Sequence, residues 1–403
     1  RDDGERILDG ASGLWCVNAG HGRATIAEAI AAQAKQLDYS PAFQMGHPLA
    51  FKLTARLADM LPGDLDHVFL TNSGSESVET ALKIALAFHR RRGEESRLVL
   101  VGRERGYYGA NFGGISVGGI AANKEDFGPP LEEGNLLPHT HHPDHNAFSK
   151  GAPDWGSHLA DALEKIVEKH GGKTVAAVIV EPVAGSAGVL VPPKGYLQRL
   201  RDICDRHEIL LIFDEVITGF GRLGSAFACE KFNVMPDMVT LAKGLTNGAA
   251  PMGAVVVRSY IYDTFLRTDT PGNTIEFAHG YTYSGHPLAC AAALAAQDIY
   301  RDEDLFARAS EIAPYWEEAV HSLKGLPHVT DIRNMGLAAG IDLEPIPDKP
   351  AARAFEIYLR AFEEGLLIRT TGDIVSLSPP LIVERHEINR MMELLTTLLK
   401  QAA

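Results

Sequence analysis

The chain has 403 residues, 45% of them hydrophobic and 22% charged, which is the composition of a soluble globular enzyme with a large core. The formal net charge of -14 disfavours nucleic acid as a partner, and no apolar run approaches the roughly 20 residues that a membrane span needs. The four cysteines are widely spaced and form no CxxC pair, so the sequence indicates neither a disulfide framework nor a zinc site, and a reducing cytoplasm fits best.

Three segments are predicted along the chain. Residues 1–45 begin without a signal-peptide pattern, contain a helix over 25–37, and are expected to contribute to a small domain and to the active site. We expect residues to precede Arg1, because the opening Arg-Asp-Asp-Gly resembles the middle of a strand and turn. Residues 46–300 form a large domain, and residues 301–403 form a smaller C-terminal domain. The helices expected in the C-terminal domain cover 301–323, 350–364 and 384–402.

The large domain alternates apolar strands with amphipathic helices. Apolar runs rich in β-branched residues indicate strands buried on both faces, and their alternation with helices predicts βαβ units. The strands are expected over 67–71, 97–101, 175–181, 209–214, 238–242 and 253–257. The helices are expected over 75–91, 158–169, 196–207 and 287–300. The predicted fold class is therefore α/β, a mostly parallel central sheet flanked by helices, with a smaller α+β domain beside it.

A short polar stretch, Thr71-Asn-Ser73-Gly74-Ser75, joins the first of these strands to a helix. Small residues there let backbone N–H and hydroxyl groups approach a phosphate, whose charge the helix dipole favours. The alternative is a helix N-cap, a common use of Ser or Asn before a helix. A P-loop is excluded because the pattern GxxxxGK[ST] is absent.

Two features follow in the chain. Tyr107 lies among glycines after the strand at 97–101, where its ring could stack on a planar cofactor or simply belong to the core or a turn. The stretch 123–156 is rich in Pro, His, Asn and Asp and is predicted to be a long irregular excursion, of a kind that is often functional. Its clustered histidines make a metal site conceivable, but without a cysteine or a helical pattern we expect no metal. These histidines are His139, His141, His142 and His145.

Two apolar strands end in charge, one in Asp214 and the other in Lys243. In open α/β sheets, ligands lie beyond the carboxyl ends of the strands, where both residues fall. Pyridoxal phosphate would satisfy both, because Asp214 can keep its pyridine nitrogen protonated and Lys243 can bond its aldehyde. Taken singly, Asp214 could cap a helix and Lys243 could be a solvated lysine. Their occurrence together on one sheet favours the cofactor.

Glu181 and Arg369 also stand at the ends of apolar strands. A surface role is the alternative for both, but the guanidinium fork of an arginine suits a substrate carboxylate.

Several motifs resemble the class III, fold-type I aminotransferases, and the likeness covers essentially the whole chain. These motifs are Glu181-Pro-Val-Ala-Gly, Phe213-Asp-Glu-Val-Ile-Thr-Gly-Phe-Gly-Arg, Leu241-Ala-Lys-Gly and Gly280-Tyr-Thr-Tyr-Ser-Gly-His-Pro. A second set resembles the ω-amino acid:pyruvate (β-alanine:pyruvate) aminotransferases within that class, and amine:pyruvate and taurine:pyruvate enzymes share many of its patterns. This set comprises Ser12-Gly-Leu-Trp, Leu37-Asp-Tyr-Ser-Pro, Phe43-Gln and Gly46-His-Pro.

The resemblance implies roles for individual residues. Lys243 and Asp214 would be catalytic, with Tyr107 and Val216 enclosing the cofactor ring. The predicted cofactor-binding residues are Ser73, Gly74, Ser75, Tyr107, Asp214, Val216, Lys243 and Thr282, the last supplied by the neighbouring subunit. The predicted substrate-binding residues are Trp15, Phe43, Glu181 and Arg369, with Phe43 reaching across a dimer interface.

One position departs from the family pattern. The family usually has Tyr-His-Gly where this chain has Tyr107-Tyr108-Gly109. Tyr107 can still stack on the cofactor ring, whereas the hydrogen bonds and the pocket shape near position 108 are expected to differ from those of the family.

These residues predict a pyridoxal-phosphate transaminase that moves an amino group from an ω-amino acid or amine to pyruvate by a ping-pong cycle. A homodimer with shared active sites is expected, and a tetramer is left open. Arg369 should swing to solvent or to Glu181 when a substrate lacks a carboxylate. The competing predictions are an aminomutase, decarboxylase or epimerase of the same fold, and a nucleotide-dependent phosphate transferase using the loop at 73–75, which lacks a Walker lysine.

Overall fold

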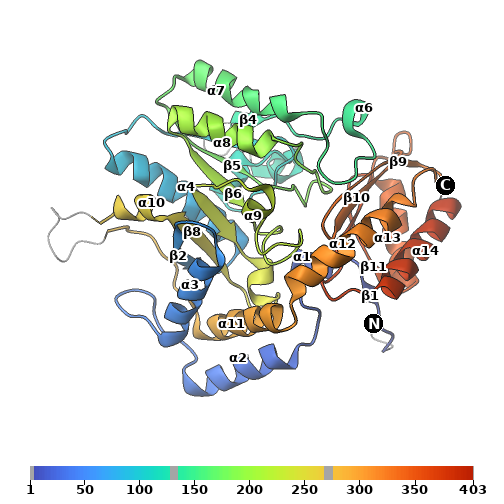
Figure 1. Ribbon diagram of the computed structural model, residues 1–403, viewed down its shortest axis with the longest axis horizontal. Helices are drawn as coiled ribbons and strands as arrows, with labels where there is room; N and C mark the ends of the chain where they lie inside the picture. The colour runs from blue at the N-terminus through green and yellow to red at the C-terminus, as the bar shows by residue number, and fades with distance from the viewer. Residues whose placement is uncertain (1–3, 128–134, 267–275, 403) are drawn as a thin grey trace.

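The computed structural model describes residues 4–127, 135–266 and 276–402, and a seven-stranded sheet runs through its centre (Figure 1). In sheet order the strands are β2 (Leu65–Thr71), β8 (Gly253–Arg258), β7 (Met238–Leu241), β6 (Leu210–Asp214), β5 (Val175–Val180), β3 (Val99–Arg103) and β4 (Asn135–Leu137). The pairs from β7 to β4 are parallel, and β8 runs antiparallel to both β7 and β2. The predicted mostly parallel sheet is confirmed.

Both faces of this sheet are covered by helices. In β5, Ala177 and Ile179 pack in one hydrophobic cluster with α4 (Gly74–Arg91), and Val178 and Val180 pack in another with α8 (Tyr196–His207). This alternation explains the continuous apolar runs, because each strand must present apolar side chains to both sides. The other helices up to residue 302 are α1 (Ser12–Trp15), α2 (Ala24–Gln36), α3 (Pro48–Met60), α5 (Phe112–Val117), α6 (Pro143–Asn146), α7 (Ala162–His170), α9 (Ala228–Phe232), α10 (Ser259–Asp263) and α11 (Pro287–Asp302).

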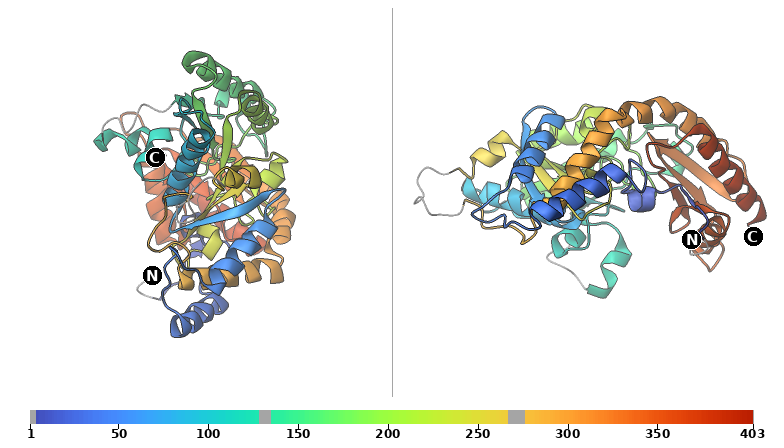
Figure 2. Two further views of the ribbon diagram at one scale, coloured as in Figure 1. Left: turned by 90° about the vertical axis from the view of Figure 1, so that its left-hand side faces the viewer. Right: turned by 90° about the horizontal axis from the view of Figure 1, so that it is seen from below.

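The C-terminal part of the chain forms its own layer at one end of the molecule (Figures 1 and 2). Its antiparallel sheet has the order β12 (Arg369–Thr371), β13 (Ile374–Leu377), β10 (Ala338–Leu343) and β9 (Val329–Met335). The helices α12 (Leu305–His321) and α13 (Ala352–Glu363) pack on this sheet, and α14 (Arg385–Gln401) packs on both helices. The N-terminal strand β1 (Leu8–Asp9) pairs with β11 (Leu366–Leu367) in this part. The three predicted segment boundaries stay a prediction.

The predicted elements differ from the observed ones in the region around the excursion. The helix expected over 158–169 is a 3-10 turn, Ser157–Asp161, followed by α7, and Gly156 before it has a φ of 115°. The 3-10 helix η1 (Ala121–Asn123) leads into the excursion, which contains η2 (Glu125–Phe127), β4 and α6 and is therefore not wholly irregular. Among the described residues, no helix is long and apolar enough to cross a membrane.

Candidate active site

A cavity of about 150 Å³ opens beyond the carboxyl ends of the parallel strands. It is lined by Gly74, Ser75, Tyr107, Gly109, Glu181, Asp214, Val216, Ile217, Ala242 and Lys243. Seven of the residues predicted from the sequence are therefore in its wall. Gly109, Ile217 and Ala242 were not predicted, although each lies within two residues of a predicted one.

Asp214, the last residue of β6, is a buried carboxylate at this cavity. Its Oδ1 accepts hydrogen bonds from the Val216 N–H at 3.0 Å and from the Thr240 hydroxyl at 3.0 Å. Burial raises the pKa of Asp214 to about 6, although these hydrogen bonds and the charge of Lys243 oppose the shift. A cation placed in the cavity would therefore stabilise the ionised form.

Lys243 directly follows β7 and opens the short helix η4 (Lys243–Thr246). Its φ of 48° lies in the left-handed region, which a lysine rarely adopts. Burial lowers the pKa of Lys243, while the charges of Asp214 and Glu181 raise it and that of Arg369 lowers it. The sequence 238–243 thus places an amine with a depressed pKa opposite a buried carboxylate.

The N-terminus of α4 forms one end of the cavity through Gly74 and Ser75. A Cβ on Gly74 would lie 3.0 Å from Val216, so glycine allows the helix end to approach that wall closely. Ser73 differs from Gly74 and Ser75 in its role. Its hydroxyl accepts a hydrogen bond from the Glu76 N–H and so caps the helix. Ser73 does not line the cavity, and its role in cofactor binding stays a prediction.

Glu181 directly follows β5 and lies in the same cavity wall. Its two carboxylate oxygens accept hydrogen bonds from the N–H groups of Tyr107 at 3.0 Å and Gly185 at 3.2 Å. Burial and the nearby charge of Asp214 raise the pKa of Glu181 to about 7. Glu181 forms no ion pair with Arg369 in this structure, and its predicted part in substrate binding stays a prediction.

Trp15 and Arg369 are not among the residues that line the cofactor cavity. Trp15 is 2% exposed, packs with Ile217 of the cavity wall, and has an indole N–H without a partner among the described residues. Arg369 opens β12, lies close enough to Lys243 to affect its pKa, and also has a buried Nε without a partner among the described residues. Both side chains lie close to the site, and the indole N–H of Trp15 and the Nε of Arg369 remain available to donate a hydrogen bond.

Phe43 and Thr282 lie together on an exposed face instead of in this chain's own cavity. Phe43 is 53% exposed, and a Cβ on Gly280 would lie 2.6 Å from its ring. The Thr282 carbonyl accepts a hydrogen bond from the Tyr39 hydroxyl at 3.1 Å. This placement is the one expected of residues that complete a neighbouring subunit's site.

Tyr108, the position that departs from the family pattern, is 1% exposed and belongs to the hydrophobic cluster that contains Ala177 and Ile179 of β5. A Cβ on Gly106 would lie 2.7 Å from its hydroxyl, so the glycine makes room for the larger ring. Burial raises the pKa of Tyr108, and its hydroxyl has no partner among the described residues. The predicted change in hydrogen bonding near this position stays a prediction.

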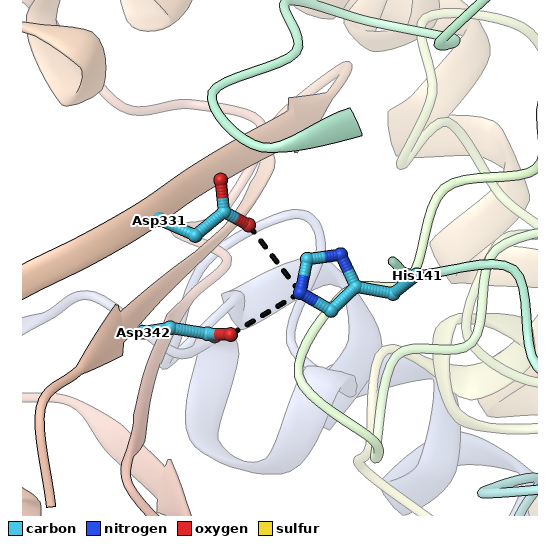
Figure 3. Close-up of side chains that lie close together, drawn as sticks. All are labelled: His141, Asp331 and Asp342. Carbon is cyan, nitrogen blue, oxygen red and sulfur yellow. Dashed lines mark hydrogen bonds and ion pairs between the residues drawn. The ribbon is translucent and has the colours of Figure 1, made fainter. Parts of the chain in front are cut away.

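Of the clustered histidines, His141 joins two carboxylates (Figure 3). Its Nε2 lies 3.5 Å from Asp331 and 3.3 Å from Asp342, and the three residues together could hold a metal ion. However, the guanidinium of Arg333 already lies 2.7 Å from each carboxylate and supplies the positive charge there. The expectation of no metal stays a prediction.

Comparison with known proteins decides the family. The model of the family described as aminotransferase class-III matches residues 1–399. The chain belongs to this family. An omega-aminotransferase of Caulobacter vibrioides is 59% identical to this class III aminotransferase over 399 residues, 99% of this chain and 90% of that protein. A beta-alanine–pyruvate aminotransferase of Pseudomonas aeruginosa is 49% identical over 393 residues, 97% of this chain and 87% of that protein.

Solved structures show the same fold. An amine transaminase from an uncultivated Pseudomonas species, in its PLP-bound form, has a TM-score of 0.92 and 38% identity, covering 100% of this chain and 92% of that one. An (S)-enantioselective omega-transaminase from Thermomicrobium roseum has a TM-score of 0.91 and 36% identity, covering 99% and 89%. The predicted fold type, enzyme class and pyridoxal-phosphate cofactor are confirmed, and a nucleotide-dependent phosphate transferase is excluded.

The residues of the cavity fit pyridoxal phosphate. The α4 N-terminus at Gly74 and Ser75 suits its phosphate, because unpaired helix N–H groups and the helix dipole favour an anion. The hydrogen bonds that Asp214 accepts from the described residues reach only Oδ1, so Oδ2 is available to a protonated ring nitrogen. Lys243 supplies an amine for the aldehyde, and Tyr107 and Val216 supply the walls.

Proposed function

We propose that this class III aminotransferase transfers an amino group from an ω-amino acid or amine, of the β-alanine type, to pyruvate and forms alanine. The observation that carries the proposal is the 59% and 49% identity, across nearly the whole chain, to the omega- and beta-alanine–pyruvate aminotransferases. Arg369, which is close enough to Lys243 to affect its pKa, and Trp15, which packs with Ile217 of the cavity wall, support it, because together they suit substrates with and without a carboxylate.

Three residues of the chain have separate roles in such a reaction. Bound pyridoxal phosphate supplies an aldehyde that takes up the amine and a ring that accepts electrons. Asp214 holds a proton on the ring nitrogen, and its burial keeps that charge pair away from water. Lys243 has the lowered pKa that suits an amine which accepts and returns protons at the reacting carbon. Arg369 binds the carboxylate of the acceptor.

A donor panel with pyruvate as acceptor tests this proposal. β-Alanine, taurine, putrescine and a benzylic amine should be compared by alanine formation and by carbon dioxide release. We expect alanine from β-alanine, with one alanine formed for each donor consumed. A putrescine–pyruvate aminotransferase of Pseudomonas aeruginosa is 36% identical to this chain, so the diamine is included. Carbon dioxide release, or turnover of the amine without pyruvate, would instead indicate a decarboxylase, aminomutase or epimerase.

We further propose a homodimer in which each subunit completes its partner's site. Phe43, Thr282 and their neighbours Tyr39 and Tyr283 form an apolar exposed face, with the two tyrosine rings 6.2 Å apart. An isologous dimer would bury this face on both subunits at once. A cytoplasmic location is also proposed, because all four cysteines are free and three of them are buried.

A Lys243→Ala chain mixed with a Thr282→Ala chain should regain activity that neither homodimer has. Each heterodimer would contain one site with both Lys243 and Thr282, so roughly half of the wild-type activity per dimer is expected. Activity is measured after the heterodimer is purified through two different affinity tags. Heterodimers as inactive as the Lys243→Ala homodimer would contradict the shared site.

Arg369→Ala should weaken the half-reaction with pyruvate far more than the half-reaction with a carboxylate-free amine. Losing a charge-assisted, two-pronged contact costs about 1.5–3 kcal/mol, or roughly ten- to a hundredfold. Single-turnover rates of each half-reaction, followed by cofactor absorbance, measure the difference. Arg369→Lys keeps the charge without the fork and should be intermediate. Equal losses in both half-reactions would mean that Arg369 supports the fold or the cofactor instead.

A further inference from the structure

The turn after β5, residues 184–190, forms a buried wall beside the cavity. Ala184 and Leu190 close it with two backbone hydrogen bonds of 3.0 and 2.9 Å. Within it, Val189 has a φ of 60°, an unfavourable conformation for a β-branched residue that persists only where its surroundings impose it. Val189 is fully buried in one hydrophobic cluster with Trp15 and the cavity residue Ile217. The strained residue therefore forms part of the wall next to the site.

Arg333 of β9 holds this turn from the C-terminal layer. Its Nε and Nη2 both donate to the Gly188 carbonyl, at 2.9 and 2.6 Å. Arg105 donates to the adjacent Ala187 carbonyl at 2.9 Å, so two guanidinium groups hold consecutive carbonyls of the turn. The turn cannot move away without losing these charge-assisted hydrogen bonds.

The guanidinium of Arg333 is itself fixed by three side chains. Asp331 and Asp342 each pair with it at 2.7 Å, and His141 of the excursion lies against both carboxylates (Figure 3). Burial opposes ionisation of Asp342, but hydrogen bonds and charge from His141 and Arg333 prevail and hold its pKa at about 2. The phenylalanine at position 148 adds a backbone N–H to Asp331. The excursion, the second sheet and the turn therefore meet at one buried ion cluster.

We propose that Arg333 is a positioning residue for substrate binding: it fixes the 184–190 turn, keeping Val189 in its strained conformation in the wall beside Trp15. The geometry assigns Asp331, Asp342 and His141 the task of orienting that guanidinium. None of these side chains lines the cavity, so their effect on the reaction is indirect. The inference about substrates rests on the proposed function, whereas the effect on the turn does not.

Arg333→Met tests the proposal with Arg201→Met as the matched control. Arg201 also forms a largely buried ion pair, 2.8 Å from Asp237, but Asp237 directly precedes β7, so this pair lies at the opposite end of the strands from the cavity. Both variants remove a guanidinium that is paired with a buried carboxylate, and the side chains of Arg201 and Arg333 are 11% and 4% exposed. Only Arg333→Met should loosen the turn, so hydrogen exchange of its amides in the cofactor-free protein should rise about tenfold or more over Arg201→Met.

The kinetic arm uses the same variants. With whichever amine donor is turned over, Arg333→Met should raise KM about tenfold and change kcat much less, while the absorbance of the bound cofactor stays that of the wild type. If Arg333→Met does not fold, Asp342→Asn removes one partner of the guanidinium and should show the same effects more weakly. Equal exchange in the Arg333 and Arg201 variants, or an unchanged KM, would overturn the proposal. If no donor is turned over, the proposed function fails, and the exchange measurement still decides whether Arg333 holds the turn.

Discussion

Lys243→Ala is expected to abolish transamination, with a loss of about a thousandfold or more in turnover, because both the bond to the cofactor and the proton-transferring amine disappear. Lys243 is the lysine in the cavity wall, directly after β7, with its pKa lowered by burial. Borohydride reduction of the wild-type enzyme followed by peptide mapping should place the label on Lys243. Steady-state turnover and the absorbance of the bound cofactor measure the effect of the substitution.

Two controls make the assignment specific. Lys243→Arg keeps a positive charge but cannot form the bond, so it should be as inactive as the alanine variant. Lys194, an exposed lysine paired with Asp154 at 2.7 Å, can be changed to alanine and should leave turnover unchanged. A label on another lysine, or full cofactor absorbance and turnover in Lys243→Ala, would contradict the assignment.

Asp214→Asn is expected to weaken cofactor binding and lower turnover by at least roughly a hundredfold, because the protonated ring nitrogen loses its charged partner. Two unit charges about 4 Å apart attract by roughly 4 kcal/mol at an effective dielectric constant of 20, before the cost of desolvation. Asp214 is 6% exposed, so water replaces little of that attraction. Turnover and the rate at which the holoenzyme releases cofactor measure the loss.

The same substitution should have the opposite effect on the stability of the cofactor-free protein. Burial raises the pKa of Asp214 from 3.8 to about 6, so the folded state binds more protons than the unfolded state between these values. The contribution of Asp214 to stability therefore falls as pH rises through that window and stays unfavourable above it. Asp214→Asn removes this cost, and above pH 6 its cofactor-free form should melt at a higher temperature than the wild type while its holoenzyme melts lower.

Glu215→Gln is the matched control for Asp214→Asn. Glu215 is the next residue and is also buried, but its carboxylate accepts hydrogen bonds from Thr218 and from the N–H groups of Ala228 and Cys229 at the start of α9. Glu215→Gln should leave cofactor binding unchanged, because Glu215 does not line the cavity. If both substitutions affect cofactor binding alike, Asp214 does not act through a charge pair with the ring.

The strands and the charged residues at their ends could be predicted because both leave a local pattern. Each buried parallel strand is a continuous apolar run, as in 175–180, and parallel topology brings the ends of β6 and β7 to one edge. Asp214 and Lys243 therefore meet in one cavity, as the sequence predicted. Gly74 and Val216 could be assigned to the cofactor site only from the resemblance to class III aminotransferases, because a glycine and a valine have no distinctive chemistry that would identify them as cavity residues.

Other features depend on contacts that the sequence does not record. A serine such as Ser73 can either bind a phosphate or cap a helix, and the sequence does not distinguish the two roles. In the structure its hydroxyl caps α4. The partners of His141 lie about 190 to 200 residues away on another sheet, so a histidine-rich stretch could not reveal them. Arg333 appears in no motif, because its importance comes from a turn more than 140 residues earlier in the chain.

The most direct test of the account is a two-step single-turnover experiment on the wild-type holoenzyme. β-Alanine is added first without any acceptor, the small molecules are removed, and pyruvate is then added while cofactor absorbance is followed. The proposed function predicts that the donor converts the cofactor to its aminated form, that pyruvate restores the original absorbance, and that one alanine appears per site. An absorbance that pyruvate does not restore, or restoration without alanine, would contradict it.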